Sequence, residues 1–312
     1  MKIKNMAAQA VHGLENLMAS CLKRNRELDA NGVGLVSEII KSAQHFALPD
    51  GGRIFDDDLR GIKNTNIRLP YGAITAEYLV TNQTGNGVSC TRRVAYAIEL
   101  TRDKLSEISK NLHGHFDGML GFYKDDVFIF IGGVYMIDET KQWLPSAIGV
   151  VLASGWDYGS KKLTGEKGEI LTTQYFPVMG DYIAENVVSE SCIHELYGDV
   201  MDEASSILEM CEALSCSNVK TEKQKYNPLK DRPMSEPKVP VYETKVLTID
   251  TGAVKKTGTG SGGGDGGGNG RSVRQHLRRG HIRRLKSGNL WVQSCVVGSD
   301  KNGIITKSYR VK

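Results

Sequence analysis

Apolar residues recur at helical spacing in three parts of the chain. The first run covers residues 3–30, with Met6 and Leu14 among its apolar positions, and predicts one long amphipathic helix. A second helix is expected over residues 34–48, where the sequence PDGG would end it. Helical periodicity returns over residues 183–215 and predicts one or two long helices.

Alternating apolar positions and β-branched or aromatic residues predict the strands. In residues 92–100, Val94, Tyr96 and Ile98 share one face, and this strand is expected to pair with residues 67–80 across the turn NQTGNG. The remaining strands are expected over residues 124–138 (one or two central strands), 147–154 and 242–250. Two helices, an antiparallel sheet and one or two further helices predict an α+β body.

The domain boundary lies where the composition changes most. Residues 258–270 read GTGSGGGDGGGNG, with nine glycines in thirteen residues. Such a segment loses too much backbone entropy to form a helix or strand and predicts a flexible linker. Residues 221–241 contain four prolines and predict an extended or irregular segment. We therefore expect three parts: a body over 1–250, a linker over 251–272 and a basic β-hairpin module over 273–312.

The composition is that of a globular protein. Of 312 residues, 40% are hydrophobic and 24% charged, which is far from the composition of a disordered chain. No run reaches the roughly 18 apolar residues of a membrane span, and no secretion signal is recognised at the N-terminus. The six cysteines are scattered and favour free thiols in a cytoplasmic protein without membrane contact.

Charge is divided unequally between the two ends of the chain. Residues 271–312 hold eleven Lys or Arg and one acid, Asp300, so this segment carries +10. The whole chain carries +4, which leaves −6 for residues 1–270. A small basic module attached to an acidic body is typical of a protein that contacts a polyanion.

Candidate metal ligands occur in two places, and neither predicts a metal site. His113, His115 and Asp117 alternate, but glycines interrupt them and a polar loop is the better interpretation. The second group consists of Cys192, His194, Cys211 and Cys216. Cys192 and His194 are two residues apart and point to different faces of the expected helix, so packing in a helical core is the simplest interpretation.

No catalytic constellation stands out. Asp56, Asp57 and Asp58 are three consecutive carboxylates, but consecutive residues seldom converge on one ion, so a solvated turn or helix start is favoured. No phosphate-binding glycine loop and no nucleophile elbow occur. The sequence favours a binding protein that needs no cofactor, and nuclease activity at these acids, or at His113 and His115, stays an open alternative.

The basic C-terminal segment predicts a β-hairpin. Residues 280–285 and 290–297 are the expected strands, KSGN is the turn, and Gly288 is free to take positive φ. Residues 303–311 are a candidate third strand. Guanidinium groups match phosphate oxygens and an exposed aromatic ring stacks on bases, which predicts an RNA- or ribosome-binding surface. The alternative is a solubilising surface with Trp291 in a small core. The candidate residues are His276, Arg278, Arg279, Gly280, His281, Arg283, Arg284, Lys286 and Trp291.

The segment HLRRGHIRRLKSGNLWVQSCVVGS, residues 276–299, resembles the C-terminal signature of a large family of phage and mobile-element proteins. The best-known branch is the second family of type V-A anti-CRISPR proteins. Its founding members carry RRGHW, where this chain has Ile282 after RRGH. Upstream, RLPYGAITAEYL and ILEMCEALSCSNV resemble the family in order more than in identity.

The resemblance implies a phage-encoded regulator in the cytoplasm of an infected bacterium. Members of the anti-CRISPR branch recognise the N-terminal peptide of a nascent target protein and cause loss of its transcript. The implied partners are therefore a nascent polypeptide and a translating ribosome or RNA. A nucleic-acid-binding phage protein without a peptide ligand, and a nuclease, are the alternative hypotheses.

Overall fold

The computed structural model describes most of the body and parts of the C-terminal segment. The described ranges are residues 4–54, 68–80, 89–111, 127–153, 174–186, 190–224, 226–232, 236–249, 274–278, 281–292, 295–297 and 299–304. The expected linker over 251–272 lies outside them. So do Asp56, Asp57, Asp58, His113, His115 and Asp117. None of the helices in these ranges combines the length and hydropathy of a bilayer-crossing segment.

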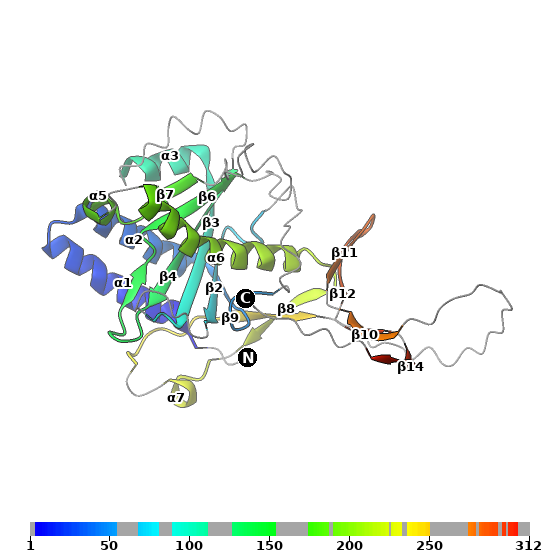
Figure 1. Ribbon diagram of the computed structural model, residues 1–312. Coiled ribbons are helices and arrows are strands. Elements are labelled where there is room, and N and C mark those ends of the chain that lie inside the picture. The colour runs from blue at the N-terminus through cyan, green and yellow to red at the C-terminus, as the bar shows by residue number, and fades with distance from the viewer. Residues whose placement is uncertain are drawn as a thin grey trace.

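Two helical layers enclose a mixed sheet, which confirms the α+β class (Figure 1). Helices α1 and α2 lie on one face of the sheet, and α6 lies across the other. The helices are α1 (Met6–Lys23), α2 (Glu27–Ser42), α3 (Arg102–Asn111), α5 (Gly180–Asn186), α6 (Glu190–Leu214) and α7 (Pro228–Asp231).

Within the described residues, nine strands form the body sheet, in the order β7-β6-β4-β3-β2-β1-β9-β8 with β5 paired to β4. Strands β1, β2 and β9 run parallel to one another, and the other neighbours are antiparallel. The strands are β1 (Gln44–Ala47), β2 (Ala73–Leu79), β3 (Arg92–Thr101), β4 (Val127–Met136), β5 (Trp143–Pro145), β6 (Ile148–Ala153), β7 (Gln174–Pro177), β8 (Val219–Gln224) and β9 (Thr244–Ile249).

The expected single helix over residues 3–30 is wrong. It is two helices, because α1 ends where Asn25 takes a left-handed backbone conformation with φ 57. The backbone N–H groups of Arg24 and Arg26 both donate to the carbonyl of Cys21, at 3.0 Å each. An Asn in this conformation is a common way to satisfy the last carbonyls of a helix, and α2 begins two residues later.

The expected helix over residues 34–48 is also wrong at its end. Residues 44–47 form β1, with His45 and Phe46 buried between two parallel neighbours. Pairing with β2 and β9 involves residues about 30 and 200 positions away. Long-range strand pairing of this kind overrides local helical preference.

The other strand predictions are confirmed in order and approximate length. Residues 124–138 form one strand, β4, which pairs with β3 on one side and β6 on the other. The segment over 242–250 becomes β9, between β1 and β8. The region 221–241, expected to be irregular, contains most of β8 and the short α7.

The C-terminal segment forms the predicted hairpin. Strands β11 (His281–Leu285) and β12 (Gly288–Val292) are antiparallel, and Gly288 has φ 125 at the turn. Separately, β10 (Arg274–Arg278) pairs with β13 (Cys295–Val297) and β14 (Ser299–Ile304). The expected strand over 290–297 is thus two strands. The expected third strand lies mostly outside the described residues.

Gly132 of β4 lets the Tyr96 ring of β3 pack closely against this strand. A Cβ at Gly132 would clash with the Tyr96 hydroxyl, whereas Gly198 on α6 has nothing within 4 Å of such an atom. We expect Gly132→Ala to lower the free energy of unfolding by about 1–3 kcal/mol, because the buried ring has no room to move. Gly198→Ala is the matched control.

Gly198→Ala is expected to raise the free energy of unfolding by about 0.5–1 kcal/mol, since glycine inside a helix is destabilising relative to alanine. Thermal unfolding followed by circular dichroism measures both variants. Equal melting temperatures for the two alanine variants would contradict the packing at Gly132.

Candidate functional site: a cavity beside the cationic hairpin

A cavity of about 760 Å³ opens where β1 ends. Ala47, the last residue of β1, lies opposite Glu77 of β2 and Val246 of β9. Beyond it, β2 continues for two residues and β9 for three. The chain after β1 leaves the sheet, so β2 and β9 lose the strand between them. The cavity therefore lies at the carboxyl ends of parallel strands, where open α/β sheets bind their ligands.

One wall of the cavity is the loop after β1, residues 48–54. The N–H of Leu48 donates to the Glu77 carbonyl (2.9 Å) and the N–H of Gly51 to the Leu79 carbonyl (2.6 Å). The loop thus follows β2 and not β9. Its far end is held on α6, since Glu209 accepts hydrogen bonds from Arg53 Nε (2.6 Å) and the Ile54 N–H (2.8 Å).

The PDGG sequence shapes this loop. Gly51 and Gly52 have φ of 85 and 68, values that residues with a Cβ seldom adopt. A Cβ at Gly52 would also lie 2.6 Å from the Ser206 hydroxyl and 2.8 Å from the Tyr78 ring. The two glycines therefore permit both the turn and its close approach to α6.

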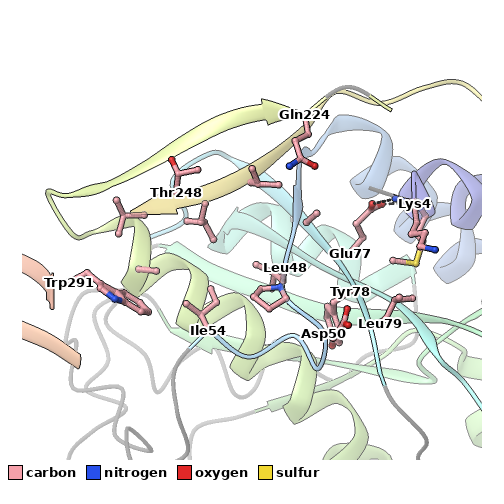
Figure 2. Close-up of a pocket in the computed structure, with 17 residues that line it drawn as sticks. Lys4, Leu48, Asp50, Ile54, Glu77, Tyr78, Leu79, Gln224, Thr248 and Trp291 are labelled. Atoms are coloured by element: carbon pink, nitrogen blue, oxygen red, sulfur yellow. Dashed lines mark hydrogen bonds between the residues drawn. The ribbon is translucent and has the colours of Figure 1, made fainter. Parts of the chain in front are cut away.

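The opposite wall is the antiparallel pair of strands β8 and β9. Figure 2 shows Thr248 and Gln224 on this side, and Leu48 and Ile54 facing them across the cavity. Most of the lining is apolar. The apolar lining residues are Met6, Ala47, Leu48, Pro49, Ile54, Leu79, Ala213, Val219, Val246, Leu247 and Trp291.

One end of the cavity meets the start of α1. Glu77 is buried and accepts hydrogen bonds from the N–H groups of Lys4 (3.1 Å), Met6 (2.7 Å) and Ala7 (3.4 Å). Burial raises the pKa of the Glu77 carboxyl, and these backbone donors act against the rise. Glu77 thus satisfies the first N–H groups of α1, which has no side-chain cap of its own at Asn5.

A buried polar cluster fixes Tyr78, whose ring lines the cavity. Glu203 of α6 is fully buried and accepts from Arg93 (2.8 Å), Tyr78 (3.0 Å) and Tyr135 (3.2 Å). Burial raises the pKa of Glu203, and the Arg93 guanidinium opposes this. With three donors on its two oxygens, this carboxylate joins α6 to the sheet and is poorly placed for proton transfer with a ligand.

Trp291 lines the other end of the cavity and belongs to the cationic hairpin, β11–β12 (residues 281–292) (Figure 2). The Trp291 N–H donates to Asn218 Oδ1, and Asn218 Nδ2 donates to the Trp291 carbonyl, both at 2.8 Å. The carboxamide of Asn218 thus pairs with a strand residue as a peptide group would. We call this contact the Asn218–Trp291 pair.

Asn289 adds further contacts between the cationic hairpin and the corner between α6 and β8. Its carbonyl accepts from the N–H of Ser217 (3.0 Å), and its side chain donates to the Ser215 hydroxyl (3.1 Å). Cys216 and Asn289 form an isolated parallel bridge. The sequence predicts a basic module that a flexible linker joins to the body. The structure shows β12 in direct contact with residues 215–218, between α6 and β8.

The predicted RNA-binding residues fall on two small sheets. His276 and Arg278 are in β10, and His281, Arg283 and Arg284 are in β11. Lys286 is exposed at the hairpin turn. Arg283 lies opposite Leu290, Arg284 lies opposite Asn289, and Ile282 lies opposite Trp291. Arg279 and Gly280 lie outside the described residues.

The candidate thiol and histidine ligands do not gather into a metal site in the described ranges, which contain no group of three or more His, Cys, Asp or Glu suited to a metal. Cys216 is buried, with Sγ 3.6 Å from the Glu212 carbonyl that it donates to. Burial raises the pKa of the Cys211 thiol to about 12. A thiol with so high a pKa is a poor nucleophile at neutral pH.

Sequence reasoning missed both the cavity and the residues that hold the hairpin beside it. The cavity depends on which strands are neighbours, and β1 pairs with residues 244–246 from the far end of the body. PDGG was a usable signal for a tight turn. Nothing in the sequence around Asn218 indicates that its carboxamide binds the backbone of residue 291.

Comparison with models of protein families, with curated proteins and with solved structures found no match to this chain.

The Asn218–Trp291 pair gives a direct test of the contact between hairpin and body. We expect Asn218→Ala to remove two hydrogen bonds worth about 1–3 kcal/mol together. The Trp291 amide should then exchange with solvent at least about fivefold faster, as measured by hydrogen exchange at residue resolution. Asn16→Ala, which removes an exposed carboxamide on α1, should leave this rate unchanged. Equal exchange in wild type and Asn218→Ala would contradict the pairing.

Proposed function

We propose that this chain binds an N-terminal peptide of a nascent target protein in the cavity and binds RNA of the translating ribosome with the cationic hairpin. Through both contacts it lowers the level of the target's transcript. One observation carries the proposal: Trp291 lines the cavity and also belongs to the cationic hairpin. A peptide site and a cationic surface are thus adjacent in one molecule.

The charge distribution supports RNA as the partner of the hairpin. Residues 271–312 carry +10, whereas residues 1–270 carry −6. Lys286 and Leu285 are exposed at the hairpin turn, and Arg283 and Arg284 occupy successive positions of β11. Arginine and lysine bind the phosphate backbone without sequence preference, which suits contact with whichever RNA the ribosome carries.

The cavity supports a peptide as the second partner. Its volume of about 760 Å³ lies within the usual range of ligand sites, and such sites are mostly apolar with a few polar groups. The resemblance of residues 276–299 to the signature of nascent-chain regulators points the same way. The alternative, RNA binding without a peptide ligand, uses the hairpin alone and gives the cavity no role.

Ribosome profiling of bacteria with and without the protein tests the proposal as a whole. We expect one transcript, or a small group with a shared N-terminal peptide, to lose most of its ribosome footprints and its mRNA. A chain that ends at residue 270 should abolish this loss, because it lacks the cationic segment. Full knock-down by the truncated chain, or no transcript lost by the complete chain, would refute the proposal.

RNA affinity tests the role of the hairpin separately. We expect Arg283→Ala and Arg284→Ala each to weaken RNA binding about fivefold at 0.1 M salt and to reduce the slope of log K against log salt by about 0.7. Lys230→Ala removes one exposed cation from α7 and should change neither value. Affinity that does not vary with salt would contradict phosphate binding by the hairpin.

A further inference from the structure

The space beside β9 has the features of a missing strand. We call it the β1 gap: the part of the cavity between loop residues 48–54 and β9, beyond Ala47. Over this stretch β9 is paired with β8 on its outer side, through Leu247↔Thr221, Thr248↔Lys220 and Ile249↔Val219. Among the described residues, no backbone hydrogen bond joins the loop to β9 on the inner side.

The backbone of β9 makes this gap more than an apolar hollow. Alternate residues of a strand direct their N–H and C=O groups to opposite edges. Every other residue among 247–249 therefore presents its N–H and C=O groups toward the β1 gap, and the residues between them bond to β8. A small apolar molecule leaves such groups unpaired, whereas an extended peptide pairs with them.

We propose that an extended peptide enters the β1 gap and adds as a strand beside β9, in the place that β1 leaves vacant after Ala47. The inference rests on the proposed peptide-binding function and specifies its mode. Three to four peptide residues match the free length of β9, at about 3.3 Å per residue. Main-chain hydrogen bonds then supply affinity, and the pockets on either side select side chains.

The lining specifies the chemistry of this peptide. Leu48, Ile54 and Leu247 line the cavity, so apolar side chains are favoured. Asp50 lies on the loop wall and is exposed, and the body as a whole is acidic. The peptide is therefore expected to carry a cationic group, either a free terminal ammonium or a Lys or Arg side chain, close to Asp50.

The outer edge of β8 is the other unpaired edge next to the cavity wall, and two observations favour the β1 gap over it. The chain just before β8 already contacts the cationic hairpin, since Ser217 and Asn218 hydrogen-bond to Asn289 and Trp291. β8 itself carries exposed polar residues such as Lys220, Glu222 and Lys223. Charged side chains on an edge strand discourage pairing with another strand.

A selection from an mRNA-displayed library of random twelve-residue peptides, with the full chain as bait, supplies the probe. Each residue of an enriched peptide is then N-methylated in turn, which removes one backbone donor without changing the protein. Strand addition predicts losses of about five- to tenfold at alternate residues over three to four positions, and little change between them. Asp50→Asn should weaken the same peptide about three- to tenfold.

Glu195→Gln provides the matched control for the loss of one exposed carboxylate. Glu195 lies near the other end of α6, about 27 Å along the helix from Ala213 at the cavity, and its substitution should leave peptide affinity unchanged.

Three results would overturn the inference. N-methyl losses without alternation would refute strand addition while leaving peptide binding, and so the proposed function, intact. Equal affinity for wild type and Asp50→Asn, with alternation retained, would place the peptide on another edge such as β8. A library that yields no binder would refute both the strand addition and the peptide-binding part of the proposed function.

Discussion

The hydrogen bonds between the Asn218 carboxamide and the Trp291 backbone hold two oppositely charged parts of the chain together. The body contributes the corner between α6 and β8, and the C-terminal segment contributes β12. Two such bonds are worth only a few kcal/mol at most. Because Trp291 lines one end of the cavity, this contact contributes to the shape of the candidate site.

The cavity itself follows from a mismatch in strand length. β1 has four residues, and its parallel neighbours β2 and β9 have seven and six. The loop after β1 is held on β2 by backbone hydrogen bonds and on α6 by Glu209, so it does not fill the space next to β9. Glu203 and Glu77 fix the surrounding helices, and this makes the opening a formed site rather than a loosely packed region.

The elements that could be predicted from the sequence are those whose signals are local. The alternation of Val94, Tyr96 and Ile98 indicated β3, and Gly288 indicated the hairpin turn. β1 was predicted as the end of a helix, because only pairing with residues 74–77 and 244–246 makes it a strand. The arginines of the candidate RNA surface could be identified from the positive charge of the C-terminal segment. The contact made by Asn218 could not be predicted, because a single polar residue before a strand carries no local signal of what it binds.

We propose that a peptide site and an RNA surface lie on either side of Trp291, with the body selecting the target. This arrangement requires that the cationic hairpin contacts the body in solution. Nuclear Overhauser spectroscopy on protein labelled only in Asn and Trp measures this directly. We expect a cross-peak between the Asn218 side-chain amide protons and the Trp291 backbone amide proton. A Trp291 amide with random-coil shifts and no such cross-peak would contradict this arrangement.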